Sequence, residues 1–268
     1  MKFAQLVVGP AGCGKSTYCH IIQEACTARK RVCRVINLDP AAEAFKYECT
    51  VDVRELVKVE EVMEHFNFGP NGALMFSMEY LLKKLDWLEE IFDTFSDDDF
   101  ILVDCPGQIE LYVHNPVMRE FLKILDNFDY RTIAVYCLDV SFVADVTKFV
   151  AGTMTALSAM VMLEIPHINV LTKYDLLSRE DQERVDNLLD KSPEELMDGF
   201  QEGLPAKFKQ FVKGLISVID SYSLVSYCCM NIEDEESIDH VLLCADMAIG
   251  YGDNLEPKEA DYFGGTDD

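Results

Sequence analysis

The sequence is poor in positive charge, in tryptophan and in long apolar runs. Among 268 residues it has 23 Lys and Arg, 48 Asp and Glu, and one Trp. A formal net charge of −25 repels nucleic acid and anionic membranes unless the few positive charges cluster. The longest uncharged run, residues 149–163, is shorter than the roughly 20 residues that span a bilayer. We therefore expect no direct nucleic-acid binding, no membrane insertion and a cytoplasmic location.

Cysteine is abundant, but its spacing is uninformative. None of the ten cysteines forms a C-x-x-C pair, and Cys228 and Cys229 are adjacent, which argues against both a disulfide framework and zinc. Cys13, Cys105 and Cys137 lie in or beside apolar runs. The pattern is typical of reduced, buried thiols. The short apolar run after Lys2 also does not resemble a secretion signal.

Short apolar runs alternate with amphipathic segments along most of the chain, which predicts an α/β fold. The expected strands are 3–9, 32–38, 100–103, 132–138, 168–171 and 224–229. Helices are expected at about 16–29, 53–66, 74–95, 116–128, 142–163, 179–190, 205–221 and 234–249. This alternation favours a three-layer architecture, with a mostly parallel sheet flanked by helices.

The domain organisation is predicted to be simple. Residues 1–252 are expected to form a single domain, with a helical insertion at about 191–214 and a flexible acidic tail at 253–268. Gly152, Ala156 and Ala159 form a small-residue stripe on the helix expected at 142–163. The stripe indicates a core helix, with a dimer surface as the alternative.

A glycine-rich loop follows the first predicted strand, in the most basic part of the chain. Residues 9–16 read G-x-x-x-x-G-K-S, the pattern of a phosphate-binding loop. Its backbone amides and the positive end of the next helix would point at the phosphates. Lys15 would contact the β- and γ-phosphates, Ser16 would ligate Mg²⁺ and Thr17 would contact the α-phosphate. The predicted nucleotide-binding residues here are Gly12, Cys13, Gly14, Lys15, Ser16 and Thr17.

Two further strand ends carry residues that suit a nucleotide. Asp104, after the strand at 100–103, is a candidate Mg²⁺ ligand, and Gly107 can direct its amide toward a γ-phosphate. The alternative for this segment is a simple Pro-Gly turn. Asp175 can accept both the N1–H and the 2-amino group of guanine, a donor pair that adenine lacks, so it favours GTP over ATP. Lys173 can lie over the base, and the alternative for Asp175 is a helix cap.

The phosphate-binding loop, the segment Asp104–Gly107 and the segment Thr172–Asp175 follow one another along the chain in the order typical of a P-loop GTPase, which the sequence therefore resembles. Thr172 stands at the position where such proteins usually have Asn. The tripeptide Gly69-Pro70-Asn71 narrows the resemblance to the GPN-loop GTPases across nearly the whole chain. Within that family, segments 9–12, 172–177 and 261–263 look closest to the third eukaryotic branch.

The resemblance implies more than the residues themselves do. It implies a dimer with a first-branch paralogue or with itself, in which Gly69, Pro70 and Asn71 reach the partner's nucleotide. It also implies that Asp39, Asn71, Gln108 and Glu110 act with Lys15 in hydrolysis by positioning the γ-phosphate and the attacking water. The family is associated with RNA polymerase II assembly and its nuclear import, which implies RNA polymerase II subunits as partners and shuttling to the nucleus.

Three functions remain open from the sequence. The first is a slow Mg²⁺-dependent GTPase that switches a dimer, with GTP, GDP and Mg²⁺ as cofactors. The second is a binding subunit that holds GTP or GDP with little turnover. The third, a small-molecule kinase, is weaker because segment 191–214 contains lysines but no arginine to clamp a transferred phosphoryl group.

Overall fold

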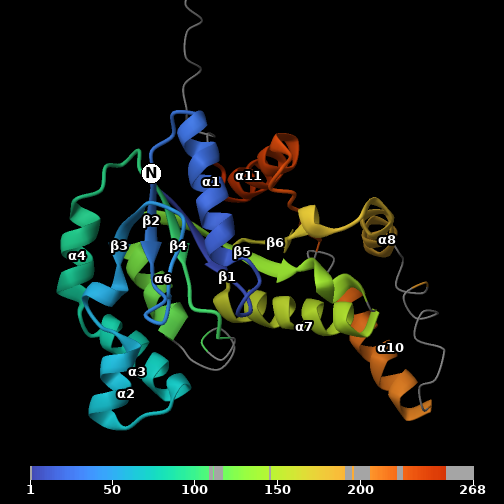
Figure 1. The fold of residues 1–268 in the computed structure, drawn as a ribbon, viewed down its shortest axis with the longest axis horizontal. Coiled ribbons are helices and arrows are strands. Elements are labelled where there is room, and N and C mark those ends of the chain that lie inside the picture. The colour runs from blue at the N-terminus through green and yellow to red at the C-terminus, as the bar shows by residue number, and fades with distance from the viewer. Residues whose placement is uncertain are drawn as a thin grey trace, which may run out of the picture.

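The computed structural model describes residues 2–108, 111, 117–144, 146–190, 195, 206–221 and 226–251. They form one seven-stranded parallel sheet with the strand order β3-β2-β4-β1-β5-β6-β7 (Figure 1). The strands are β1 (Lys2–Val8), β2 (Cys33–Asn37), β3 (Cys49–Asp52), β4 (Phe100–Asp104), β5 (Tyr130–Asp139), β6 (His167–Thr172) and β7 (Tyr227–Cys229). The predicted three-layer α/β fold is confirmed.

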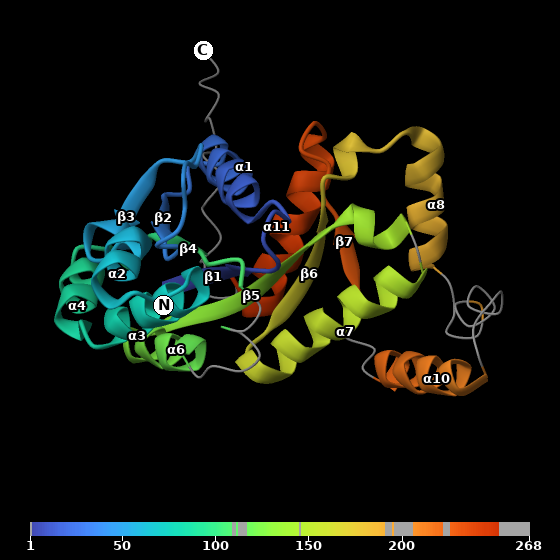
Figure 2. The same cartoon turned by 60° about the horizontal axis from the view of Figure 1, so that its bottom comes forward.

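Helices cover both faces of the sheet. They are α1 (Lys15–Ala28), α2 (Val59–Phe66), α3 (Pro70–Leu82), α4 (Leu85–Asp93), α6 (Val117–Asn127), α7 (Val146–Leu163), α8 (Arg179–Leu189), α10 (Ala206–Ser221) and α11 (Glu235–Ile249). Helices α1 and α11 pack on one face, while α6 and α7 lie on the other (Figures 1 and 2). Because helices lie on both sides, the central strands are mostly apolar, and all five residues of β4 are buried. No described helix is long and apolar enough to cross a membrane.

The structure differs from the predicted elements most clearly at three places. Strand β3 was not expected, because its four half-buried or exposed residues form no apolar run. The helix expected at 74–95 is two helices, α3 and α4, because the apolar stripe continues across a break at Lys84, whose φ of −109° and ψ of 50° are not helical. The helix expected at 53–66 shortens to α2, preceded by a 3₁₀ turn at Val53–Glu55.

The small-residue stripe of α7 faces the sheet. Gly152, Ala156 and Ala159 are buried within the chain. A side chain at Gly152 would lie 3.0 Å from Leu138 Cδ2 of β5. The core-helix interpretation is therefore confirmed, and the alternative of a dimer surface is wrong for this stripe.

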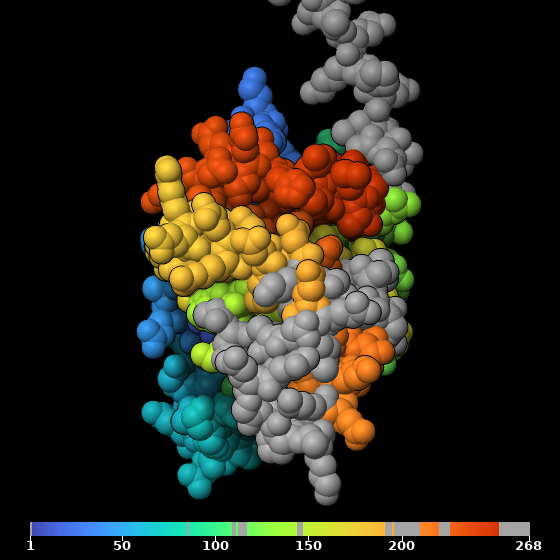
Figure 3. Space-filling model, turned by 90° about the vertical axis from the view of Figure 1, so that its right-hand side faces the viewer, coloured from blue at the N-terminus to red at the C-terminus, as the bar shows by residue number. Residues whose placement is uncertain are grey.

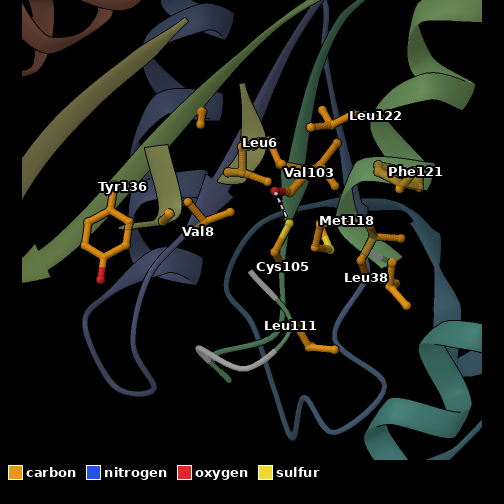
Figure 4. Close-up of a cluster of buried hydrophobic side chains, with 14 of the residues drawn as sticks. Leu6, Val8, Leu38, Val103, Cys105, Leu111, Met118, Phe121, Leu122 and Tyr136 are labelled. Carbon is orange, nitrogen blue, oxygen red and sulfur yellow. Dashed lines mark hydrogen bonds between the residues drawn. The ribbon is translucent and has the colours of Figure 1, made fainter. Parts of the chain in front are cut away.

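The loop after β4 is anchored in the core. Cys105 is completely buried, and its thiol points toward the Val103 carbonyl, 3.6 Å away (Figure 4). Leu6, Met118 and Leu111 belong to the same apolar cluster. Cys105 thus fixes the start of this loop in the core, while Asp104, the last residue of β4, lies at the carboxyl end of the sheet. Of the insertion expected at about 191–214, residues 191–205, apart from Glu195, lie outside the described residues, and residues 206–214 belong to α10. The tail expected at 253–268 also lies outside the described residues.

Candidate functional site

The glycine-rich loop connects β1 to α1 in a conformation that favours glycine. Gly9, Gly12 and Gly14 have φ angles of 139°, 73° and 91°. A side chain at Gly9 would approach the Cys137 carbonyl oxygen to 2.2 Å, so the loop leaves the sheet through a gap that only glycine fits. Helix α1 begins at Lys15, and the loop before it therefore lies at the helix's positive end.

Lys15 lies within this loop. Its side chain is largely buried, and its Nζ donates a hydrogen bond to the Pro10 carbonyl at 3.0 Å. A buried ammonium attracts an anion more strongly than an exposed one, because little water screens it. Lys15 also supports its neighbours electrostatically, since its charge lowers the pKa of Asp39 and Asp104 against the effect of burial.

Asp104 ends β4 in contact with the phosphate loop. It is buried, it accepts a hydrogen bond from Tyr47 Oη at 3.0 Å, and it interacts with the Ser16 side chain. Burial raises the pKa of Asp104, although Ser16, Tyr47 and Lys15 oppose the shift. The Ser16 hydroxyl and the Asp104 carboxylate together offer the oxygen ligands that Mg²⁺ prefers, so these residues fit a magnesium ion.

Gly107 brings the loop after β4 against the phosphate loop. A Cβ there would lie 2.7 Å from Ala11 Cα and 3.0 Å from Lys15 Nζ, so a larger residue would displace the loop backbone. The next residue, Gln108, donates from Nε2 to Asn71 Oδ1 at 3.0 Å. Asn71 lies in the exposed first turn of α3, where Gly69 is the N-cap and Pro70 follows it. The contact is therefore made within one chain.

Asp39 lies just beyond β2 and is held by its backbone. Asn37, fully buried, accepts from the Asp39 amide at 3.0 Å and donates to the Asp39 carbonyl at 3.1 Å. The carboxylate of Asp39 accepts from the Ala41 amide at 2.9 Å. Burial raises the pKa of Asp39, an effect that the Ala41 amide, Lys15 and Arg54 partly offset. Arg54 is itself held by Asp52 and by the Ala42 carbonyl.

The loop after β6 is tied to the phosphate loop. Thr172 Oγ1 donates to the Cys13 carbonyl at 2.5 Å and is 3.2 Å from the Leu138 carbonyl oxygen. Lys173 has a left-handed backbone, with a φ of 63°, and its Nζ bonds Asp139 Oδ2 at 2.5 Å. Burial raises the pKa of Asp139, but the hydrogen bonds from Lys173 and Ser141 outweigh it and lower the pKa overall. Among the described residues, the Asp175 carboxylate has no hydrogen-bond partner.

These segments enclose a cleft of about 380 Å³ at the carboxyl ends of the strands. Its lining residues include Gly12, Gly14, Lys15, Ser16, Thr17, Asp39, Asp104, Gly107 and Lys173. Thr172 and Cys13 do not line the cleft, but the hydrogen bond between them joins two of the loops that do. Asp175 lies just beyond Lys173, in the 3₁₀ turn at Tyr174–Leu176. Gly69 and Pro70 do not line it, and Glu110 lies outside the described residues. The cleft is thus built by four segments that are distant in the sequence.

Three supporting residues were missed from the sequence. Asp139 orients Lys173, and Asn37 holds the Asp39 backbone. Both are the last residues of strands, and a polar residue at the end of an apolar run in the sequence could have identified them as candidates. Tyr47 carried no comparable signal, because it lies in an irregular segment and reaches Asp104 only through the fold.

Comparisons with known proteins agree with this geometry. Residues 7–251 match the model of a family described as "Conserved hypothetical ATP binding protein". The chain is 46% identical over 261 residues to GPN-loop GTPase 3 of Danio rerio, covering 96% of this chain and 91% of that protein. It is 43% identical over 259 residues to GPN-loop GTPase 3 of Dictyostelium discoideum, covering 96% and 90%.

A solved structure has the same fold. A GTPase of Pyrococcus abyssi, crystallised in its apo form, superposes with a TM-score of 0.78 at 24% identity. The match covers 92% of this chain and 97% of that one. At this identity the likeness concerns the fold, whereas the curated relatives carry the assignment of family.

Proposed function

The chain belongs to the GPN-loop GTPase family, and from that premise we propose that it binds GTP with Mg²⁺, hydrolyses it, and switches a dimer between conformations. The observation that carries the proposal is the cleft itself. Lys15, Asp39, Asp104 and Lys173 come from four loops and meet at one edge of the sheet. A positive helix end, a buried lysine and oxygen ligands in one cleft suit a nucleoside triphosphate.

Phosphate binding is assigned to the glycine-rich loop. Its amides and Lys15 would hold the β- and γ-phosphates, leaving the Pro10 carbonyl that Lys15 now contacts. Mg²⁺ held by Ser16 and Asp104 would neutralise charge between these phosphates. The Gly107 amide, already against the phosphate loop, would donate to a γ-phosphate oxygen.

Water positioning is assigned to Gln108 and Asp39. The Gln108 amide can donate to one group and accept from another, as an attacking water requires. In the lone chain its Nε2 is bonded to Asn71, so both ends of the amide become available to the water only when Asn71 leaves. Asp39 follows β2, the strand beside β4, and Asn37 holds its backbone. Its carboxylate would therefore be a second contact for the attacking water. Glu110, which lies outside the described residues, stays a predicted third residue that positions the water.

Guanine recognition is assigned to the loop after β6. The Asp175 carboxylate is free of partners among the described residues and can therefore accept the two adjacent donors of guanine. The salt bridge with Asp139 holds the Lys173 side chain at the cleft, where its alkyl stem can cover the base. We therefore propose GTP rather than ATP as the substrate.

Dimerisation is proposed from the exposed surface around Asn71. Phe66 and Phe68 are 53% and 42% exposed, and their rings stack 5.8 Å apart beside Phe76. Exposed aromatic side chains beside a functional loop are typical of a protein interface. We propose that this surface meets a first-branch paralogue or a second copy, and that Asn71 then leaves Gln108 for the partner's site. Action in RNA polymerase II assembly and nuclear import is proposed from family resemblance alone.

A second candidate function is a nucleotide-holding subunit with little turnover. The Gln108–Asn71 bond favours it, because a Gln108 amide engaged within its own chain is less free to orient water. Partner addition separates the two functions. If the bond holds the lone chain inactive, a partner that captures Asn71 will raise the turnover; a purely binding subunit will stay inactive.

The decisive experiment compares GTP, ITP and ATP hydrolysis by the wild type and Asp175→Ala over a wide range of protein concentration. ITP lacks the 2-amino group, so the wild type should prefer GTP over ITP by about 10²-fold in kcat/KM. Asp175→Ala should lose most of that preference, and Glu183→Ala, at an exposed acidic residue of α8, serves as the control. A rate per molecule that rises with concentration supports the dimer. Equal use of ATP and GTP by the wild type would contradict the assignment.

A further inference from the structure

Two cysteines and a histidine gather at the edge of the sheet, away from the nucleotide cleft. Cys228 lies on β7, and His240 and Cys244 lie four residues apart on one side of α11. Their ligand atoms all lie within 4.8 Å of one another. Residues separated by four positions share a helix face, so α11 presents both side chains to β7 at once. None of these residues lines the cleft described above.

The spacing matches the coordination geometry of zinc. The Cys244 sulfur is 3.6 Å from His240 Nε2. Zn–S bonds of about 2.3 Å and Zn–N bonds of about 2.0–2.1 Å, at a tetrahedral angle, place sulfur and nitrogen about 3.6 Å apart. Two thiolates on the same ion would be separated by about 3.8 Å, which the upper limit of 4.8 Å for the group accommodates.

The geometry points to a Zn²⁺ site formed by Cys228, His240 and Cys244, with water as the fourth ligand. Thiolate and imidazole are the ligands that select zinc over magnesium or calcium. No fourth histidine, cysteine or carboxylate joins the group among the described residues. The exposure of His240 leaves the open position facing solvent. Figure 3 shows α11 at the surface of the molecule.

Two other sides of α11 are engaged by the rest of the chain. Val241, Leu242 and Ala245 pack toward the sheet. Asp239 and Asp246 pair with Arg29 and Arg31, which lie at and just after the end of α1. Asp239 and Asp246 are thus held by arginines, whereas His240 and Cys244 contact each other.

The site would brace β7, the shortest of the described strands. Strand β7 has three residues and pairs only with β6, so it contributes few backbone hydrogen bonds. A zinc ion would tie it to α11 and close the intervening turn, as structural zinc sites do. That turn begins at Met230, whose amide bonds the Leu171 carbonyl one residue before Thr172. The ion would therefore stiffen the sheet beside the proposed guanine loop.

A disulfide between Cys228 and Cys244 is the main alternative. A disulfide would use only the two sulfurs, whereas a zinc ion would also take up His240 Nε2, which lies 3.6 Å from the Cys244 sulfur. All ten cysteines are free thiols in the structure. The placement of the imidazole beside the two sulfurs favours the metal.

The test titrates the full chain, reduced and freed of metal by a chelator, with Co²⁺ and then Zn²⁺. We expect one equivalent of Co²⁺ to produce thiolate charge-transfer absorption and the ligand-field bands of a tetrahedral site, both abolished by Zn²⁺. Cys228→Ser and Cys244→Ser should lose the charge-transfer absorption in part and weaken binding at least about tenfold. Cys229→Ser is the matched control, because Cys229 packs into the core on the opposite face of the sheet.

A second variant keeps the test valid if the serine variants fold poorly. His240 is exposed, so His240→Gln should leave the apo protein folded, and Zn²⁺ should raise the Tm of the wild type but not of this variant. Binding that survives in all three variants would overturn the proposal. A Cys228–Cys244 crosslink in the protein as isolated without reductant, seen as the loss of two hydrogens by mass spectrometry, would also overturn it.

Discussion

The two ends of the parallel sheet are built from the same strands but differ in what they hold. At the carboxyl ends, a cleft of about 380 Å³ gathers Lys15, Asp39 and Asp104. At the amino ends, a larger cavity of about 860 Å³ lies between α6, the start of β5, the turn from α7 into β6, and the end of α11. No motif residue lines the larger cavity, and among the described residues the buried hydroxyls of Tyr130 and Thr132 have no hydrogen-bond partner.

The volume of a cavity alone therefore does not identify the nucleotide site. All strands run in the same direction, so each loop that leaves a carboxyl end meets the others at one edge. Helix α1 begins there and adds its positive end. The amino ends receive the ends of helices and the turns that lead into the strands.

Replacing the buried lysine should test the comparison most strongly. Lys15→Ala removes the main positive charge of the cleft, so kcat/KM for GTP should fall by about 10³-fold or more. Lys2→Ala is the matched control at the other end of β1, where Lys2 pairs with the exposed Asp97 at 3.4 Å. It should leave hydrolysis unchanged. Steady-state kinetics and nucleotide-binding titration of both variants measure these effects. Equal losses of kcat/KM in the two variants would contradict the assignment of the nucleotide site to the carboxyl ends of the strands.

Adding one methyl group at Gly107 should have the next largest effect. Gly107→Ala places a Cβ 2.7 Å from Ala11 Cα, which forces the phosphate loop away from the loop after β4. We expect about a 10²-fold loss of kcat/KM with the fold retained. The control is Gly214→Ala on α10, where a Cβ meets nothing within 4 Å. That change should leave hydrolysis unaffected and stabilise the helix by about 0.5–1 kcal/mol. Wild-type activity in Gly107→Ala would show that the approach is not required.

Loosening the tie between the two loops should have a smaller effect. Thr172→Val removes the hydroxyl that bonds the Cys13 carbonyl, so GTP affinity should fall about tenfold and stability by about 1–2 kcal/mol. Thr172→Ser keeps the hydroxyl and should retain most of both. Isothermal titration and urea denaturation measure the two quantities. If valine and serine behave alike, the hydroxyl has no positioning role.

A change at the amino end should alter stability and leave activity intact. His167, the first residue of β6, has its pKa lowered to about 4 by burial. Its Nε2 lies 2.9 Å from Asn169 Oδ1, while the buried Nδ1 has no partner among the described residues. Since Asn169 donates its amide to the Ser226 carbonyl, its oxygen accepts from Nε2–H, and protonation of Nδ1 would bury an unpaired charge.

The sign of the pH effect follows from these pKa values. Between about pH 6.5 and pH 4, the unfolded chain binds a proton at His167 that the folded chain does not. Stability should therefore fall by about 1–3 kcal/mol as the pH drops through this window. His167→Gln should flatten that part of the profile without changing GTP hydrolysis at pH 7, and the exposed His65→Gln is the control. An unchanged profile in His167→Gln would refute this account.

The sequence predicted much of the fold because its strands and helices differ in apolar period. Strands such as β4 form continuous apolar runs, and amphipathic segments lie between them. The exceptions have local causes. The partly exposed strand β3 has no apolar run, and the stripe across α3 and α4 hides the break at Lys84. A periodic pattern reports which residues are buried, and it does not report where the backbone turns.

The candidate site divides in the same way. Sequence motifs were sufficient to predict the phosphate loop, Asp104 and the Thr172–Asp175 loop, because each is a short run at the end of a strand and its chemistry depends on neighbouring residues. Three other contacts are visible only in the folded chain: Gln108 with Asn71, Tyr47 with Asp104, and Cys228 with His240 and Cys244. These pairs depend on how loops and helices cross the sheet, and no spacing along the chain records that.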